Sequence, residues 1–194
     1  MIPDKKLSFV LISILVALNV AQLITIRNLK SKNLYNTIAL RGEIEAERLA
    51  QREFPSSVKL VEVQNNKHKS FYKQIDEKIS IVVLFEPTGC GSCLDEKFLW
   101  NDIATLKDVN GVSIALHPYK NELKKYTNDS GIKTSVYQDS ALFLRDWFKP
   151  DRLPVKLLVS NRQVIFVDYV RENAESRKQF MNFITSYLNE YEKK

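Results

Sequence analysis

The hydrophobic and polar positions divide the chain into an uncharged amino-terminal stretch, a helical middle and a longer part with alternating elements. Residues 7–26 contain no charged side chain, and basic residues flank them on both sides. At a rise of about 1.5 Å per residue, a helix of about 20 residues spans the hydrocarbon layer of a membrane. The pattern predicts a short tail at 1–6 and a single transmembrane anchor at 7–26.

A cleaved signal peptide is the competing interpretation of this stretch. A cleavage site needs small residues at its last and third-last positions. Cleavage after Ala17 would place Leu15 at the third-last position, and cleavage after Ala21 would place Asn19 there. Neither site fits, so an uncleaved anchor is favoured. Two lysines before the run face three basic residues after it, so charge alone does not set the orientation.

Residues 27–55 are predicted to form a helical linker. They contain no proline before Pro55, and charges such as Arg41 and Glu45 follow helical spacing. The apolar positions keep no steady heptad, which favours a solvated stalk over a dimerising helix.

From Ser56 onward the pattern changes to alternating strands and helices, and this part, 56–194, is predicted to be one domain. The apolar run 79–85 is typical of a strand that is buried on both faces. Asn161 and Arg162 separate two late β-rich runs, as in a tight hairpin. Further strands are expected at 58–63, 112–116, 134–137, 155–160 and 163–169, and helices at 70–77, 94–106, 120–127, 140–148 and 180–191. This order predicts an α/β fold with a mixed central sheet covered by helices on both faces.

Composition and charge exclude several classes of protein. The apolar share of 44% and the charged share of 27% fit an ordinary globular domain. The net charge of +6 is spread evenly, with +3 before Ser56 and +3 from there onward, so no nucleic-acid partner is expected. With two cysteines in all, the chain is neither a disulfide-stapled mini-domain nor a four-cysteine zinc site.

Cys90 and Cys93 form a C-x-x-C pair at the point where the buried strand gives way to a helix. Positions i and i+3 lie on one helix face, close enough for a disulfide bond. The helix start also favours a thiolate at Cys90, which would attack, while Cys93 would resolve the mixed disulfide.

Three other uses of the pair stay open. A structural disulfide would close only a small ring, which stabilises the fold little. A metal site would need about two more ligands, and beyond carboxylates the chain offers only His68 and His117. Two reduced core cysteines are the remaining alternative.

These features together resemble the thioredoxin fold, in the version of the membrane-anchored TlpA/ResA-like thiol-disulfide oxidoreductases. The match covers the chain from about Val58 onward. It rests on the buried strand, the C-x-x-C pair, Glu96 three places after Cys93, Pro154 before the penultimate strand and the final helix.

The resemblance implies a thioredoxin-like three-layer α/β/α fold and a set of site residues. Pro154 is expected to be cis and to face the cysteines, and the backbone of Leu153 to pair with the substrate chain. Glu96 is expected to take part in catalysis. Substrate contacts are also expected at Gly89, Gly91 and Ser92. Gly89 replaces the tryptophan that is usual in the family, and the Gly91-Ser92 dipeptide departs from the commoner pairs that end in proline.

The expected function is that of a membrane-tethered enzyme that exchanges disulfides with protein substrates outside the cytoplasm, on the periplasmic or outer face. It requires an upstream thiol electron donor and no cofactor or metal. Glu86, Asp95 and Glu96 lie near the cysteines, opposed in that stretch by Lys97 alone. Negative charge disfavours thiolate, so the pair is predicted to act as a reductant. The alternative is a non-catalytic binding module of the same fold, with a metal-holding or static cysteine pair.

Overall fold

The structure is a computed structural model, and it describes residues 5–50, 53–55, 58–64, 75, 79–87, 91–107, 109–150, 152–171, 173–191 and 193. Side chains are not described at 5–9, 11, 50 and 91–95. The chain divides into two compact units, 1–41 and 42–194, which are considered separately.

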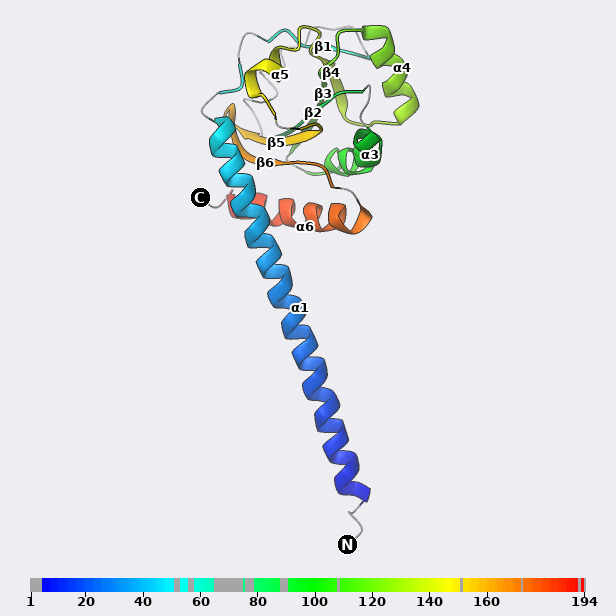
Figure 1. Ribbon diagram of the computed structural model, residues 1–194, viewed down its shortest axis with the longest axis vertical. Coiled ribbons are helices and arrows are strands. Elements are labelled where there is room, and N and C mark those ends of the chain that lie inside the picture. Colours follow the sequence, from blue (N-terminus) through cyan, green and yellow to red (C-terminus); the bar gives the residue numbers. More distant parts are fainter. Residues whose placement is uncertain are drawn as a thin grey trace. The chain divides into compact units, whose positions relative to one another are not determined.

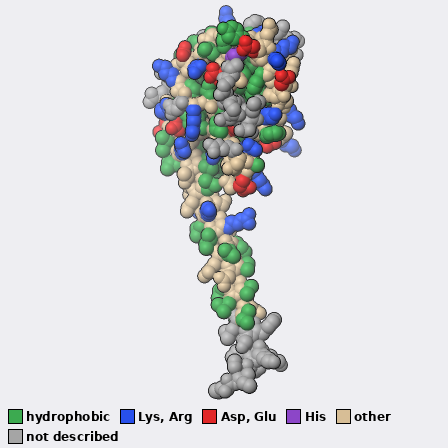
Figure 2. Space-filling view, turned by 45° about the vertical axis from the view of Figure 1, so that its right-hand side comes forward, with side chains coloured by type: hydrophobic (Ala, Val, Ile, Leu, Met, Phe, Trp, Pro, Cys, Tyr) green, Lys and Arg blue, Asp and Glu red, His purple; other side chains and the backbone are tan. Residues whose placement is uncertain are grey.

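The first unit is formed by the greater part of helix α1, Lys5–Ala50. Its apolar side chains lie on the helix surface (Figure 2), and Leu23, for example, is 67% exposed. Among the described residues, one stretch near the amino terminus, Ile12–Leu49, is long and apolar enough to cross a membrane. This stretch overlaps the predicted anchor at 7–26. The exposed apolar side chains of this stretch suit the hydrocarbon layer of a membrane.

The second unit is built on a six-stranded mixed sheet with strand order β1-β4-β3-β2-β5-β6 (Figure 1). Strands β2, β3 and β4 are parallel to one another, whereas β1, β5 and β6 pair antiparallel. The strands are β1 Val61–Glu62, β2 Ser80–Phe85, β3 Asn110–Ala115, β4 Ser135–Gln138, β5 Val155–Ser160 and β6 Gln163–Asp168. The helices are α3 Gly91–Ile103, α4 Lys120–Ser130, α5 Phe143–Phe148 and α6 Ala174–Tyr191.

Successive side chains along each strand point to opposite faces of the sheet, and each face packs into its own core. One core packs alternate residues of β2, β3 and β5 against α5, where Leu144 and Phe148 are buried. The opposite face lies against α3 and α6 (Figure 1), where the rings of Trp100 and Phe85 contact each other in a tilted arrangement at a centroid distance of 5.0 Å. The predicted mixed sheet between two helical layers is therefore confirmed.

Most predicted elements are present, with shifted ends. Strand β2 is buried at every position, as the apolar run predicted. The hairpin turn is confirmed, since Asn161 and Arg162 have positive φ values of 48° and 65°, which a two-residue type I′ turn requires. The first strand is shorter than predicted, because β1 pairs with β4 only at Val61 and Glu62. The helix predicted at 70–77 lies outside the described residues except for Ile75.

The compact unit begins at Gly42, earlier than the domain boundary at Ser56 that the sequence indicates. The last turns of α1 are part of this unit, and Ala46 and Leu49 belong to its hydrophobic core. Gly42 packs directly on Phe166, and a Cβ added at Gly42 would lie 1.9 Å from Cε2 of that ring. Residues assigned to the linker therefore supply part of the core.

Candidate functional site

The C-x-x-C segment follows β2 and leads into α3. Helix α3 begins at Gly91, so Gly91, Ser92 and Cys93 form its first turn. Cys90 and Gly89 lie outside the described residues, and of Gly91, Ser92 and Cys93 only the backbone is described. The backbone agrees with the predicted strand-to-helix transition, which puts Cys90 immediately before a helix start.

The peptide between Leu153 and Pro154 is cis, as the resemblance implied. Pro154 is buried and directly precedes β5, and Leu153 is partly buried against the α5-side core. In the antiparallel pairing of β5 with β2, Val155 lies opposite Leu84. Pro154 is therefore placed at the end of β2 from which the chain runs toward the cysteines.

Glu96 and Lys156 form a fully buried ion pair between α3 and β5. The Lys156 Nζ donates to Oε1 and Oε2 of Glu96 at 2.9 and 3.1 Å. The glutamate is 0% exposed and the lysine 2%. The Trp100 Nε1 also donates to Oε2, at 3.4 Å, and the backbone N–H of Arg171 donates to Oε1. Each carboxylate oxygen thus accepts two hydrogen bonds.

Asp168 and Arg171 extend this pair into a four-residue charge cluster. The Lys156 Nζ lies 3.3 Å from Oδ2 of Asp168 and donates to the backbone carbonyl of Tyr169. Arg171 donates from both Nε and Nη2 to the Asp168 carboxylate. With two carboxylates and two cations, the cluster is electrically balanced. Buried charges require such partners because isolated ones are costly.

The carboxylates near the cysteines are less isolated than the sequence argument assumed. Glu96 is paired with Lys156, and an Oε1 of Glu86 lies 3.7 Å from Nη1 of Arg145. Both cations come from distant parts of the chain. The side chain of Asp95 is not described. Lys97, the cation that the sequence argument counted, lies over the ring of Phe98 at 5.3 Å.

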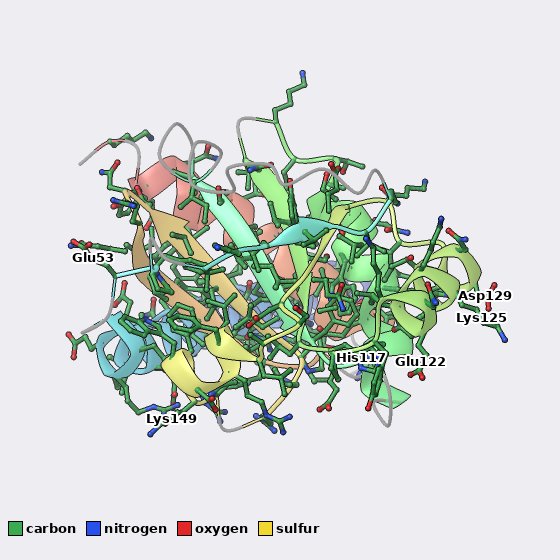
Figure 3. All side chains as sticks on the ribbon, turned by 90° about the horizontal axis from the view of Figure 1, so that it is seen from above. Glu53, His117, Glu122, Lys125, Asp129 and Lys149 are labelled. Carbon is green, nitrogen blue, oxygen red and sulfur yellow. The ribbon has the colours of Figure 1, made fainter. Side chains whose placement is uncertain are left out.

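His117 follows β3 at the end of the sheet where β2 also ends, and its side chain is buried. Its Nε2 lies 3.2 Å from Oε2 of Glu122, and the two side chains meet beside the start of α4 (Figure 3). In the parts of the chain that the structure describes, no three His, Cys, Asp or Glu side chains are grouped as metal ligands. On α4, the hydroxyl of Tyr126 is buried without a partner among the described residues, and burial raises the pKa of Tyr126.

Sequence reasoning singled out Glu96 but missed Lys156, Asp168 and Arg171. A signal for Lys156 was present in the strand sequence VKLLVS, where a lysine interrupts an otherwise apolar run. A charged residue inside a buried strand indicates a buried partner. The identity of that partner, 60 residues earlier in the chain, was not readable from spacing.

No protein-family model matches the chain, and no curated protein matches it in sequence. Solved structures do resemble it. A secreted Mycobacterium tuberculosis disulfide oxidoreductase homologous to E. coli DsbE is 12% identical, with a TM-score of 0.55, covering 72% of this chain and 98% of that one.

Two further structures show the same similarity. The thioredoxin domain of a Bacteroides vulgatus thiol-disulfide oxidoreductase is 12% identical with a TM-score of 0.55, covering 70% of this chain and 95% of that one. StoA from Bacillus subtilis is 12% identical with a TM-score of 0.51, covering 65% and 99%. The chain therefore has the thioredoxin-like fold, and thiol-disulfide oxidoreductases are among its structural neighbours.

Proposed function

We propose that this protein is a membrane-tethered thiol-disulfide oxidoreductase that exchanges disulfides with protein substrates. Cys90 is the attacking thiol, Cys93 resolves the mixed disulfide, and the backbone at Leu153 and Pro154 receives the substrate chain. Gly89, Gly91 and Ser92 border the reacting cysteines and contact the substrate.

The observation that carries this proposal is the contact between the cysteine helix and the strand that follows Pro154. Glu96 lies one helical turn after Cys93, and Lys156 lies two residues after Pro154. Their ion pair, at 2.9 Å, joins the two segments in the core. This contact between α3 and β5 supports the proposal that one substrate segment reaches both the start of α3 and the cis-proline peptide.

The exchange proceeds in two balanced steps. The Cys90 thiolate attacks one sulfur of a substrate disulfide, forming a mixed disulfide, and the other substrate sulfur leaves and takes up a proton. The thiolate of Cys93 then attacks the sulfur of Cys90 and releases the second substrate thiol. The substrate gains two electrons, and the enzyme is left with a Cys90–Cys93 disulfide. An upstream dithiol donor returns it to the reduced form.

Helix α1 supports the tethering part of the proposal. Its exposed apolar surface suits a lipid environment, and the span at 7–26 serves as an uncleaved single-pass anchor. We place the domain on the extracytoplasmic face, because an anchored exchanger is useful where soluble cytosolic reductants do not act.

The direction of electron flow is a separate part of the proposal. Carboxylates near the cysteines favour a reductant, and the pairing of Glu96 with Lys156 weakens their combined effect. We retain the reductant direction on the charge of Asp95 and test it by equilibration with glutathione. A potential near the roughly −120 mV of strongly oxidising enzymes contradicts it.

The test of the exchange activity is dithiothreitol-driven reduction of insulin by the full chain in mild detergent. We expect turnover that is lost in Cys90→Ser and retained in the matched surface variant Ser140→Ala. A wild-type rate in Cys90→Ser overturns the proposal. Metal analysis of the same preparation decides the alternative, because a binding module with a metal-holding pair contains bound metal and shows no turnover.

Trapping identifies the partner. In Cys93→Ser the mixed disulfide is not resolved, so substrate proteins stay covalently bound to Cys90 in membranes. Mass spectrometry of the trapped species gives both the substrate and its compartment. Recovery of cytosolic proteins alone contradicts the extracytoplasmic placement.

A further inference from the structure

The charges of the buried cluster at Glu96 balance one another, although the sequence around the cysteines predicts an excess of negative charge. Glu96 is fully buried and accepts hydrogen bonds from Lys156, Trp100 and the backbone of Arg171. All these groups are donors, so the carboxylate is satisfied as an anion. The carboxylate is shielded from water, so its charge is screened only weakly.

Lys156 supplies the compensating charge. Besides Glu96, its ammonium contacts the Tyr169 carbonyl and Oδ2 of Asp168, and it lies 5.5 Å from the ring centroid of Phe180. Asp168 is itself neutralised by Arg171. Removal of Lys156 therefore leaves Glu96 as the carboxylate without a side-chain cation, while the Asp168–Arg171 pair stays balanced.

The charge of Glu96 is close to the cysteine pair along α3, because Glu96 is three positions after Cys93. Residues at this spacing lie on the same face, about one turn apart. A charge at such a distance inside a protein changes the ionisation of a neighbouring group appreciably, since the interior screens it weakly.

We propose that Lys156 is a positioning residue of the exchange reaction, which compensates Glu96 and thereby sets how readily the cysteine thiols ionise. The inference rests on the proposed function and adds a residue to its machinery. A purely structural ion pair would affect folding only. The proposed role also predicts that thiol ionisation changes with the sign of the charge that is removed.

The experiment measures the pH dependence of iodoacetamide alkylation at each cysteine of the reduced full chain in mild detergent, resolved by mass spectrometry. Four proteins are compared with wild type: Lys156→Met, Glu96→Gln, the double variant, and Lys125→Met as a control. Lys125 is an exposed lysine on the outer side of α4 (Figure 3) and is not a member of the cluster, so its loss removes the same charge elsewhere.

We expect opposite displacements that cancel. Lys156→Met leaves a negative charge and raises the pH midpoint of alkylation by about half a pH unit or more. Glu96→Gln leaves a positive charge and lowers the midpoint. The double variant restores neutrality and returns the midpoint to the wild-type value, and Lys125→Met does not change it.

Displacement of both single variants in the same direction, or of neither, overturns the inference. So does a double variant that is displaced as far as a single one. If one single variant does not fold, the inference is overturned when the other is not displaced in its expected direction, or when the double variant is displaced as far as that single variant. Alkylation requires reduced thiols but no turnover, so a result against Lys156 is distinct from a result against disulfide exchange, which the Cys90→Ser assay decides.

Discussion

Substitution of Gly42 by alanine tests whether the last turns of α1 belong to the folded domain. Gly42 is inside a helix, where alanine is intrinsically better by about 1 kcal/mol. Sequence reasoning alone therefore predicts a stabilised protein. The structure predicts the opposite, because the new Cβ would meet Cε2, Cζ and Cδ2 of Phe166 at 1.9, 2.4 and 2.5 Å.

The magnitude follows from the space around the ring. Carbon atoms in contact lie about 3.5–4.0 Å apart, so the ring or the helix must move by about 1.5 Å or more. Phe166 is 1% exposed and is held by Phe183 and Tyr187, with centroid distances of 5.1 and 5.2 Å. Overpacking costs about 1–3 kcal/mol, and an overlap of this size belongs in the upper part of that range, at about 2–3 kcal/mol. The gain of about 1 kcal/mol in helix propensity is subtracted from this cost. We expect a net loss of about 1–2 kcal/mol.

Urea denaturation of the full chain in mild detergent measures this loss. Both tryptophans, Trp100 and Trp147, lie in the unit that starts at Gly42, so their fluorescence reports the unfolding of that unit. The matched variant is Gly42→Ala in a Phe166→Leu background, where the smaller side chain removes most of the clash and the alanine should cost less. A Gly42→Ala protein as stable as wild type, or more stable, refutes the packing described for α1.

Three other predictions concern the buried cluster, the tyrosine and one helix end. Lys156→Met alone should lower the free energy of unfolding by about 3–5 kcal/mol, because it leaves the buried Glu96 without its partner. The double variant Lys156→Met with Glu96→Leu removes both charges and should be closer to wild type in stability. Equal losses for the two proteins in urea titration contradict this. Because burial raises the pKa of Tyr126, its contribution to stability is complete below about pH 10 and is lost as the pH rises toward the folded-state value. Tyr126→Phe should therefore flatten the alkaline loss of stability, and an unchanged pH profile argues against it. Gly131→Ala should lower the free energy of unfolding by about 1 kcal/mol, because this C-cap residue of α4 has a φ of 68°, which alanine adopts only with strain. A Cβ at this position would meet nothing within 4 Å, so the loss comes from the backbone alone. Thermal unfolding measures it, and an unchanged stability would indicate that the helix end adapts.

The fold was largely predictable because its strongest signals are local. The apolar run before the cysteines produces a strand that is buried at every position, and the Asn161-Arg162 dipeptide produces the expected turn. Local signals were weaker at the first strand, whose length depends on its two pairing partners in β4. They also failed at the start of the domain, because helix spacing does not reveal that Gly42 lies against Phe166.

The candidate site was predictable in its motif and not in its charges. The C-x-x-C spacing, Glu96 and the cis Leu153–Pro154 peptide follow from the pattern or from the resemblance. The electrostatic environment depends on pairs of residues that lie far apart in sequence, such as Glu96 with Lys156 and Glu86 with Arg145. Reasoning from the neighbours of a cysteine in sequence therefore overestimates the negative charge around it.

If the protein is tethered as proposed, the inclusion of the end of α1 in the core restricts how the domain is released from a membrane. A protease that cuts just upstream of Gly42 leaves the compact unit whole. A cut at Ser56 removes Ala46, Leu49 and Phe54 from the core and uncovers apolar surface that they bury. Shedding of an intact soluble form thus requires cleavage within the helix before Gly42, and recombinant fragments that begin at Ser56 should be prone to aggregation.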